Sequence, residues 1–284
     1  MRDKYIAYAY GTNRAGSNKA NSYVNALDYL RDIFASSNCE FRGLNVWQVT
    51  DAGKLTDLYH FILEQQRLGT DGIFREGKRS SYWKNRFYSA AIKNYVEFLV
   101  EYRFEEKLDS VCRSHSDGRA LSNELIKQRV ENIDALIRCD IEKEGKDVEA
   151  TVKTRLNQNY FRKMVLGNYS HRCCVTGLPI PAILRASHIA SWAEDKSNRL
   201  NPSNGLCLSA TYDAAFDKHL ISFDKNYRLL LSPAIETYAG KAYESYFKNL
   251  AGNSMSLPKH FLPDVELLRK HREITMEQKH PCDP

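Results

Sequence analysis

Residues 184–192 read LRASHIASW, a run in which small and branched side chains surround a single histidine. Such a run predicts a half-buried β-strand. A lone histidine in an apolar strand is most often a core residue whose ring nitrogens are hydrogen-bonded. Whether His188 is a core residue or a catalytic one therefore depends on the polar residues that accompany it elsewhere in the chain.

The composition is that of an ordinary folded protein, and the length of 284 residues favours two domains. Hydrophobic residues make up 43% and charged residues 27%. The first residues, MRDKYIAYAYGTNRAG, contain no apolar signal segment, and seven cysteines at irregular spacing favour a reducing compartment. We therefore expect a cytoplasmic protein with no membrane partner.

The N-terminal part has the periodicity of α-helices. In residues 22–34, SYVNALDYLRDIF, apolar side chains recur at i, i+3, i+4 and i+7, and Ser22 or Asn21 could cap the helix. The same period marks 55–68 and the residues that follow Phe87, whereas 39–49 reads as a strand or a loop. These patterns predict a mostly α-helical N-terminal domain.

A basic segment lies within this domain. Residues 67–93 carry seven Lys or Arg against two acidic residues, with five Phe, Tyr or Trp side chains between them. Cations beside aromatic faces suit a nucleic-acid surface, and a solvated loop packed by its own aromatics is the alternative. The candidate DNA contacts are Lys78, Arg79, Lys84 and Arg86.

A polar segment separates the two halves of the chain. Residues 123–149 show a narrow apolar stripe that predicts one long helix, and Gly145 in the sequence EKEGKD is the candidate hinge. We expect an N-terminal domain over 1–145, which includes this linker helix, and a second domain over 150–284.

The second half mixes helix and strand signals. A helix is expected over 160–166, followed by a strand that ends on His188 and a turn at Asn204-Gly205. A short strand, a helix around 211–218 and a β-hairpin around Lys225-Asn226 complete the pattern. The fold class is therefore α+β.

Three polar residues stand out in this half: His188, Asn204 sixteen residues later, and Asp213 nine residues after that. On a short helix, Asp213 and Asp217 are i and i+4, so their carboxylates share one face and could hold Mg²⁺, with Mn²⁺ as the alternative. Asp217 could instead cap the turn that follows. A neutral imidazole accepts a proton from water at physiological pH, and a bound metal neutralises charge on a phosphate. Asn204 could bond the backbone across the loop and so fix the imidazole.

Residues 150–275 resemble the HNH endonucleases, also called ββα-metal or His-Me finger nucleases, and in particular their predicted restriction endonuclease branch. The resemblance lies in RCCVTG, LRASHIASW, RLNPSNGLCLS, YDAAFDKHLISFD, RLLLS and LLRKHRE, in this order. It implies a ββα-metal nuclease domain in which His188 is the general base, Asn204 is the central asparagine and Asp213 is a metal ligand. Helical segments similar to those of the N-terminal part recur beside such modules, and we expect residues 1–140 to select the DNA target.

Two positions depart from the pattern of that family. Many members carry an acidic residue or a histidine just before the catalytic histidine as a metal ligand, where this chain has Ser187. Tyr212 stands where some members have a histidine, and the nine-residue offset from Asn204 favours Asp213 as the third member instead. The candidate metal ligands are therefore Asp213, Asp217 and Ser187.

Several other residues have competing interpretations. Arg185 and Lys218 are candidate phosphate contacts or ordinary surface cations, and His219 is expected to cap the helix that precedes it. The adjacent Cys173 and Cys174 lack the spacing of a zinc site, so we expect no structural zinc.

The resulting hypothesis is a metal-dependent DNA endonuclease of restriction or defence type. Its partner would be double-stranded DNA, and cutting both strands with one site per chain would favour a homodimer. The alternatives are an endonuclease that depends on methylated or hydroxymethylated DNA, and a non-catalytic DNA-binding protein that retains the HNH scaffold.

Overall fold

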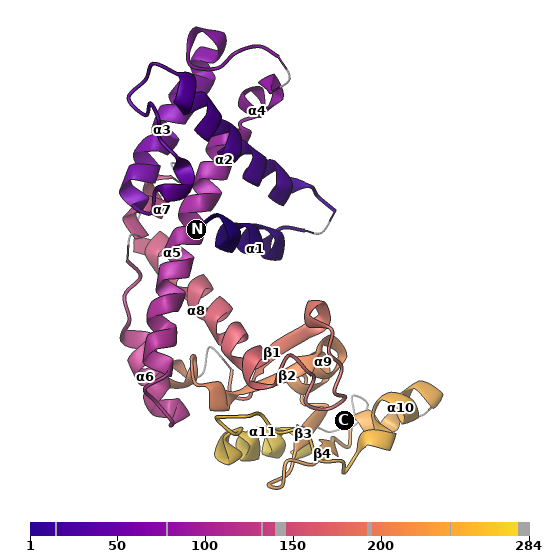
Figure 1. Cartoon of the computed structure of the whole chain (residues 1–284). Coiled ribbons are helices and arrows are strands. Elements are labelled where there is room, and N and C mark those ends of the chain that lie inside the picture. Colours follow the sequence, from indigo (N-terminus) through magenta and orange to yellow (C-terminus); the bar gives the residue numbers. More distant parts are fainter. Residues whose placement is uncertain are drawn as a thin grey trace. The chain divides into compact units, whose positions relative to one another are not determined.

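The computed structural model describes residues 1–14, 16–77, 79–131, 133–139, 146–191, 195–238 and 240–277. Helices dominate the first half, and two small antiparallel sheets occur in the second (Figure 1). Within these ranges no helix is long and apolar enough to cross a membrane. The α+β expectation is therefore confirmed in its coarse form.

The chain divides into two compact units, and each is built from two stretches of sequence. The first comprises Met1–Lys107 and Arg129–Lys153, and the second comprises Leu108–Gln128 and Thr154–Pro284. The expected domains, 1–145 and 150–284, remain a prediction. Residues 108–128, which belong to the first expected domain, pack with the second unit.

Amphipathic helices build the first unit. They include α1 (Arg2–Thr12), α2 (Lys19–Ser36), α3 (Ala52–Leu68), the short α4 (Ser80–Lys84), the N-terminal part of α5 (Phe87–Cys112) and α7 (Ile133–Arg138). Their apolar faces enclose an aromatic-rich core, in which the ring of Tyr5 packs edge-on against Tyr95 and Phe98. The three helices expected from the apolar periodicity are confirmed, and residues 39–49 form a loop with one 3₁₀ turn, η1 (Val46–Gln48).

Two local expectations in this half are wrong. Helix α2 starts at Lys19, upstream of both predicted caps, because its buried stripe already begins at Ala20; the Ser22 hydroxyl donates to the Asn18 carbonyl instead. The single helix expected over 123–149 is interrupted: α6 (Gly118–Lys127) ends where Gln128 turns to extended backbone. The apolar stripe predicted one helix, but its residues pack into two different cores. Those of α6 pack in the second unit, and those of α7 pack against α3 in the first. Gly145, the candidate hinge, lies outside the described residues.

A ββα arrangement forms the centre of the second unit. Strand β1 (Leu184–His188) pairs antiparallel with β2 (Gly205–Ser209), and α9 (Ala210–Asp217) packs against both (Figure 1). The strand ending on His188 and the helix around 211–218 are thereby confirmed. The helix expected over 160–166 is the end of the longer α8 (Lys146–Asn168).

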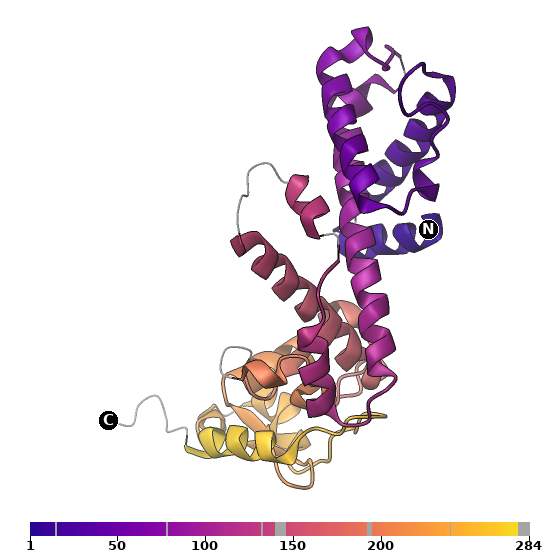
Figure 2. The same cartoon turned by 90° about the vertical axis from the view of Figure 1, so that its left-hand side faces the viewer.

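A second hairpin and further helices complete this unit. Strands β3 (Ile221–Phe223) and β4 (Leu229–Leu231) form the hairpin expected around Lys225-Asn226. The Asp224 carboxylate accepts the backbone N–H groups of Asn226 and Arg228 and so closes the turn. Helix α10 spans Lys241–Tyr246, and α11 (Val265–Glu277), the yellow helix of Figure 2, packs against β3. Single 3₁₀ turns lie between several of these elements: η2 (Gly69–Asp71), η3 (Pro181–Ile183), η4 (Lys196–Asn198), η5 (Pro202–Asn204), η6 (Ile235–Thr237) and η7 (Lys248–Leu250).

Candidate active site

The pairing of β1 with β2 brings the first two predicted site residues together. In this register His188 lies opposite Gly205, so Asn204 is one residue from the position facing His188. The Ile189 amide also donates to the Asn204 carbonyl over 2.9 Å. The antiparallel pairing thus brings together two residues, His188 and Asn204, that are sixteen positions apart in the sequence.

Asn204 is almost fully buried and fixes the chain that follows His188. Its Oδ1 accepts the Ala190 amide over 2.8 Å, and its Nδ2 donates to the carbonyls of Ala190 and Asn198 over 3.1 Å each. One side chain therefore satisfies three backbone groups from two segments. This bonding is the loop-bridging role expected for Asn204.

The His188 ring is positioned by α8. It stacks on the Phe161 ring with 3.8 Å between centroids and 11° between planes. Gly205 leaves room for this stack, since a Cβ at that position would lie 2.4 Å from Val165 Cγ2 and 2.9 Å from Phe161 Cζ. A side chain at 205 would therefore displace the ring of Phe161 on which His188 stacks.

The hydrogen bonding of His188 assigns its tautomer. Nε2 lies 3.2 Å from the Arg199 carbonyl, and because a carbonyl only accepts, Nε2 carries the proton and Nδ1 keeps its lone pair. Burial lowers the pKa of His188 below its ordinary value, while the bond to Arg199 acts in the opposite direction. A neutral imidazole with a basic Nδ1 is therefore the form present near pH 7.

The predicted metal ligands lie beside this histidine. The Ser187 hydroxyl donates to the Asp213 carboxylate, which links the buried end of β1 to the first turn of α9. Asp213 and Asp217 are one turn apart, and desolvation, followed by the charge of Asp213, raises the pKa of Asp217. Ser187, His188, Asp213 and Asp217 all line one cavity of about 560 Å³.

These residues fit a hard divalent cation only as a sparse site. Mg²⁺ commonly binds proteins through one or two carboxylates and completes its shell with water and substrate phosphate. No group of three or more His, Cys, Asp or Glu side chains with metal-binding geometry occurs in the part of the chain that the structure describes. The carboxylates of Asp213 and Asp217 with the Ser187 hydroxyl are thus compatible with Mg²⁺ and not with a saturated all-protein site.

Tyr212 has a structural role. Its buried hydroxyl donates to the Tyr246 carbonyl, and its ring packs against Phe247 at 5.7 Å between centroids. The hydrogen-bond partner of Ser187 is the neighbouring Asp213.

Two histidines that the sequence did not mark as a pair share the cavity. His219 follows α9 with a φ of 53°, and its amide caps the helix by donating to the Phe216 carbonyl over 2.9 Å. Its ring packs 4.4 Å from that of His271 on α11, and among the described residues its buried Nδ1 has no partner. Burial, followed by the charge of His219, lowers the pKa of His271 to about 4. The pairing joins segments fifty residues apart, so no local pattern marks it.

A half-buried arginine supports the start of β1 and was also not predicted. The Arg162 guanidinium on α8 donates to the Leu184 carbonyl over 2.8 Å. Burial, followed by the nearby Arg185, lowers the pKa of Arg162. Arg185 itself is exposed and donates to the Ala182 and Leu184 carbonyls, and Lys218 is exposed at the end of α9. Both predicted phosphate contacts thus have solvent-accessible side chains.

Two of the predicted DNA contacts of the first unit, Arg79 and Lys84, have protein partners of their own. Arg79 pairs with Asp32 over 3.4 Å and lies 3.9 Å above the Tyr29 ring, and Lys84 pairs with Glu76 over 3.0 Å. Arg86 is exposed at a left-handed φ of 57°. Lys78 lies outside the described residues.

Three cysteines of the second unit are core residues. Cys173, Cys174 and Cys207 are buried and free, and the Cys174 amide donates to the Cys207 carbonyl over 2.7 Å. This bond ties the turn after α8 to the centre of β2.

Comparison with known proteins identifies the central segment of this unit. No curated protein matches the chain. Residues 173–224, which include β1, β2 and α9, match the family model of the HNH endonucleases, so this part of the chain carries the pattern of an HNH nuclease module.

Proposed function

We propose that the protein is a metal-dependent DNA endonuclease of restriction or defence type that acts in the cytoplasm. The observation that carries the proposal is the position of His188, whose basic Nδ1 belongs to a ring fixed by Phe161 and Arg199. Next to it lies the Ser187–Asp213 pair, in the same cavity and in a segment that matches the HNH endonuclease family.

His188 is the proposed general base. Nδ1 of a neutral imidazole accepts a proton from a water molecule as that water attacks a DNA phosphate. The Arg199 carbonyl holds Nε2–H and orients the ring, and it stabilises the imidazolium that forms when Nδ1 is protonated. Asn204 holds the backbone that follows the histidine and so keeps this orientation.

Asp213, with Ser187 and Asp217, is the proposed holder of one divalent cation, Mg²⁺ or Mn²⁺. When bound, such a cation neutralises charge on the phosphate and stabilises the leaving 3′ oxygen. Arg185 and Lys218 are exposed cations available to neighbouring phosphates of the strand. Selection of double-stranded DNA by the N-terminal domain, and a homodimer that cuts both strands, complete the proposal.

A plasmid assay tests the proposal. Wild type, His188→Ala and the matched control His260→Ala, an exposed histidine of the same unit, are incubated with supercoiled plasmid and Mg²⁺ or Mn²⁺. Plain, methylated and hydroxymethylated plasmids are compared. Wild type and His260→Ala should nick or linearise at least one of them, and His188→Ala should not. Cleavage of modified plasmids alone would favour the modification-dependent alternative.

A non-catalytic DNA-binding protein is the second candidate. It is favoured by the sparse ligand set, in which a serine precedes the histidine and no three-residue metal cluster occurs among the described residues. DNA binding by wild type without cleavage of any plasmid, under either metal, would establish this candidate and overturn the nuclease. Cleavage by His188→Ala at the wild-type rate would show that another group is the base.

A further inference from the structure

Helix α11 forms one wall of the cavity that holds His188. It contributes four lining residues, of which Lys270 and His271 are polar. The segment that matches the HNH endonucleases, 173–224, ends well before this helix. The role of this wall is therefore not given by the family match.

The buried His271 anchors α11 to the helix and the strand beside it. Its Nε2 donates to the Phe216 carbonyl over 3.1 Å, and its Nδ1 accepts the Ser222 hydroxyl over 3.0 Å. The ring also stacks on that of Phe216, with 3.7 Å between centroids and 4° between planes. Phe216 directly precedes Asp217, so these contacts fix α11 to the end of α9 that carries a proposed metal ligand.

Lys270, the neighbour of this anchor, is exposed and lines the cavity. Along the helix its natural partners are Glu266, one turn before it, and Glu273, one turn after it. Both carboxylates pair with Arg269 instead. Since Lys270 makes no ion pair with any residue that the structure describes, its charge is available to a ligand of the cavity.

The charges of the cavity indicate what Lys270 can bind. Within the described lining, Lys270 is the one Lys or Arg side chain, and it shares the cavity with the carboxylates of Asp213 and Asp217. One divalent cation would neutralise the two carboxylates. The ammonium of Lys270 then gives the cavity a single positive charge, which matches the single negative charge of a DNA phosphate. Without Lys270 the cavity would have no net attraction for that phosphate.

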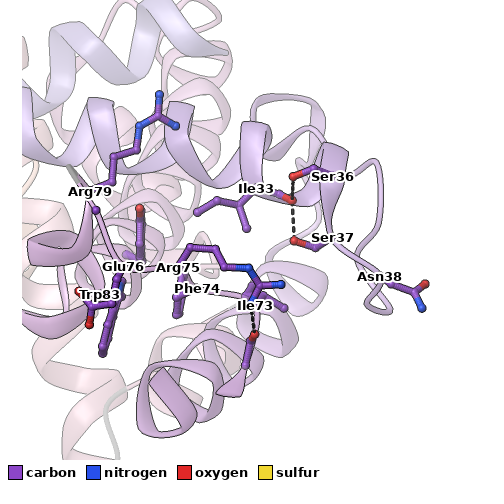
Figure 3. A pocket seen from close by; sticks show the side chains of 13 residues that line it. Ile33, Ser36, Ser37, Asn38, Ile73, Phe74, Arg75, Glu76, Arg79 and Trp83 are labelled. Carbon is purple, nitrogen blue, oxygen red and sulfur yellow. Dashed lines mark hydrogen bonds between the residues drawn. The ribbon is translucent and has the colours of Figure 1, made fainter. Parts of the chain in front are cut away.

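A larger cavity, of about 820 Å³, lies in the first unit and has a different lining (Figure 3). Its described lining contains no histidine and no aspartate. The rings of Phe74 and Trp83 stack on each other, and the charged Arg79 and Glu76 pair with residues of the same unit. Of the two cavities, the one in the second unit combines a base, two carboxylates and an available cation.

From these contacts we propose that Lys270 is a further catalytic residue that binds the phosphate to be cut, and that His271 is its positioning residue. The proposal rests on the nuclease function proposed above. It adds to that function a group outside the HNH segment, in a helix that the family match does not include.

The reaction shows why a cation at this place accelerates cleavage. The oxygen of the attacking water bonds to phosphorus, a proton of that water passes to Nδ1 of His188, and the bond from phosphorus to the 3′ oxygen breaks. The 3′ oxygen takes up a proton from solvent. The phosphate carries one negative charge before the attack and two while five oxygens surround phosphorus. The Lys270 ammonium donates a hydrogen bond to a non-bridging oxygen and keeps its own proton, so it stabilises the more highly charged state most.

Single-turnover cleavage separates this role from ordinary DNA binding. Enzyme in excess over a plasmid that wild type cuts, with Mg²⁺, gives the rate of the cleavage step. Fluorescence anisotropy with a labelled fragment of that plasmid gives the affinity, in chains that also carry His188→Ala so that DNA stays uncut. The test variants are Lys270→Ala and Lys270→Arg. The control is Lys225→Ala, an exposed lysine of the turn between β3 and β4 that lies outside the cavity.

Lys270→Ala should lower the single-turnover rate about 100-fold, the loss that follows removal of one donor to a developing charge, and should leave the affinity for DNA nearly unchanged. Lys270→Arg should restore most of the rate because it keeps the charge. Lys225→Ala should cut as wild type does, and urea unfolding curves confirm that the variants fold. A loss confined to affinity, or an equal loss of rate in Lys225→Ala, would make Lys270 an ordinary phosphate anchor and overturn the proposal.

A double variant tests the positioning role. His271→Gln alone should slow cleavage, and His271→Gln added to Lys270→Ala should slow it no further, because both act through one contact. Additive losses would overturn the role of His271. If wild type cuts plasmid and Lys270→Ala cuts it equally fast, the role of Lys270 is overturned and the nuclease stands. If wild type cuts no plasmid, the proposed function fails and the catalytic role of Lys270 fails with it.

Discussion

Replacing Gly205 by alanine tests how the HNH module positions its histidine. The added Cβ would lie 2.4 Å from Val165 Cγ2 and 2.9 Å from Phe161 Cζ, distances at which these two side chains of α8 must shift. Overpacking of this kind costs about 1–3 kcal/mol of folding free energy. Because the Phe161 ring stacks at 3.8 Å on that of His188, the same shift displaces the imidazole.

Two measurements follow the two effects. Urea unfolding monitored by circular dichroism gives the change in stability, and plasmid nicking by folded protein gives the change in rate. Displacing a catalytic group by a fraction of an ångström to an ångström lowers the rate by up to about 100-fold. We therefore expect Gly205→Ala to be both less stable and slower than wild type.

Gly167→Ala is the matched control. Gly167 lies in α8 and has nothing within 4 Å of an added Cβ, so alanine should stabilise the helix by up to about 1 kcal/mol and leave nicking unchanged. An equal urea midpoint for Gly205→Ala and wild type would refute the packing argument. A destabilised Gly205→Ala that nicks at the wild-type rate would refute the coupling between Phe161 and His188.

Three further outcomes are expected. Asn204→Ala should cost about 1–3 kcal/mol in urea unfolding, because three backbone groups lose their partner. Burial lowers the pKa of His271 to about 4 in the folded protein, whereas a histidine of the unfolded chain has a pKa of about 6.5. As the pH falls, the unfolded chain therefore takes up a proton before the folded protein does, and unfolding becomes more favourable. This histidine should thus remove about 3 kcal/mol of stability from wild type between pH 6.5 and 4, and His271→Gln should lose correspondingly less. EDTA should stop nicking, and added Mg²⁺ should restore it. Asp213→Asn should weaken Mg²⁺ binding in calorimetry, and unchanged binding would show that Asp213 is not a metal ligand.

The sequence by itself determined the local elements around the site. The small and branched residues around His188 predict the strand that ends on it, and the helix predicted around 211–218 places Asp213 and Asp217 one turn apart. These features follow from the repeat of side-chain direction along a strand or helix, which depends only on neighbouring residues. The hairpin around Lys225-Asn226 follows from turn chemistry in the same way.

Only the tertiary structure decided how these elements meet. The Phe161 stack, the Arg199 carbonyl that assigns the His188 tautomer and the His219–His271 pair each join residues eleven to fifty-two positions apart. The narrow apolar stripe of 123–149 likewise predicted one helix, whereas α6 and α7 belong to different cores. Periodicity shows that a face is buried, and it does not specify the surface that covers that face. Packing between distant segments specifies that surface, and with it the chemistry of the histidine.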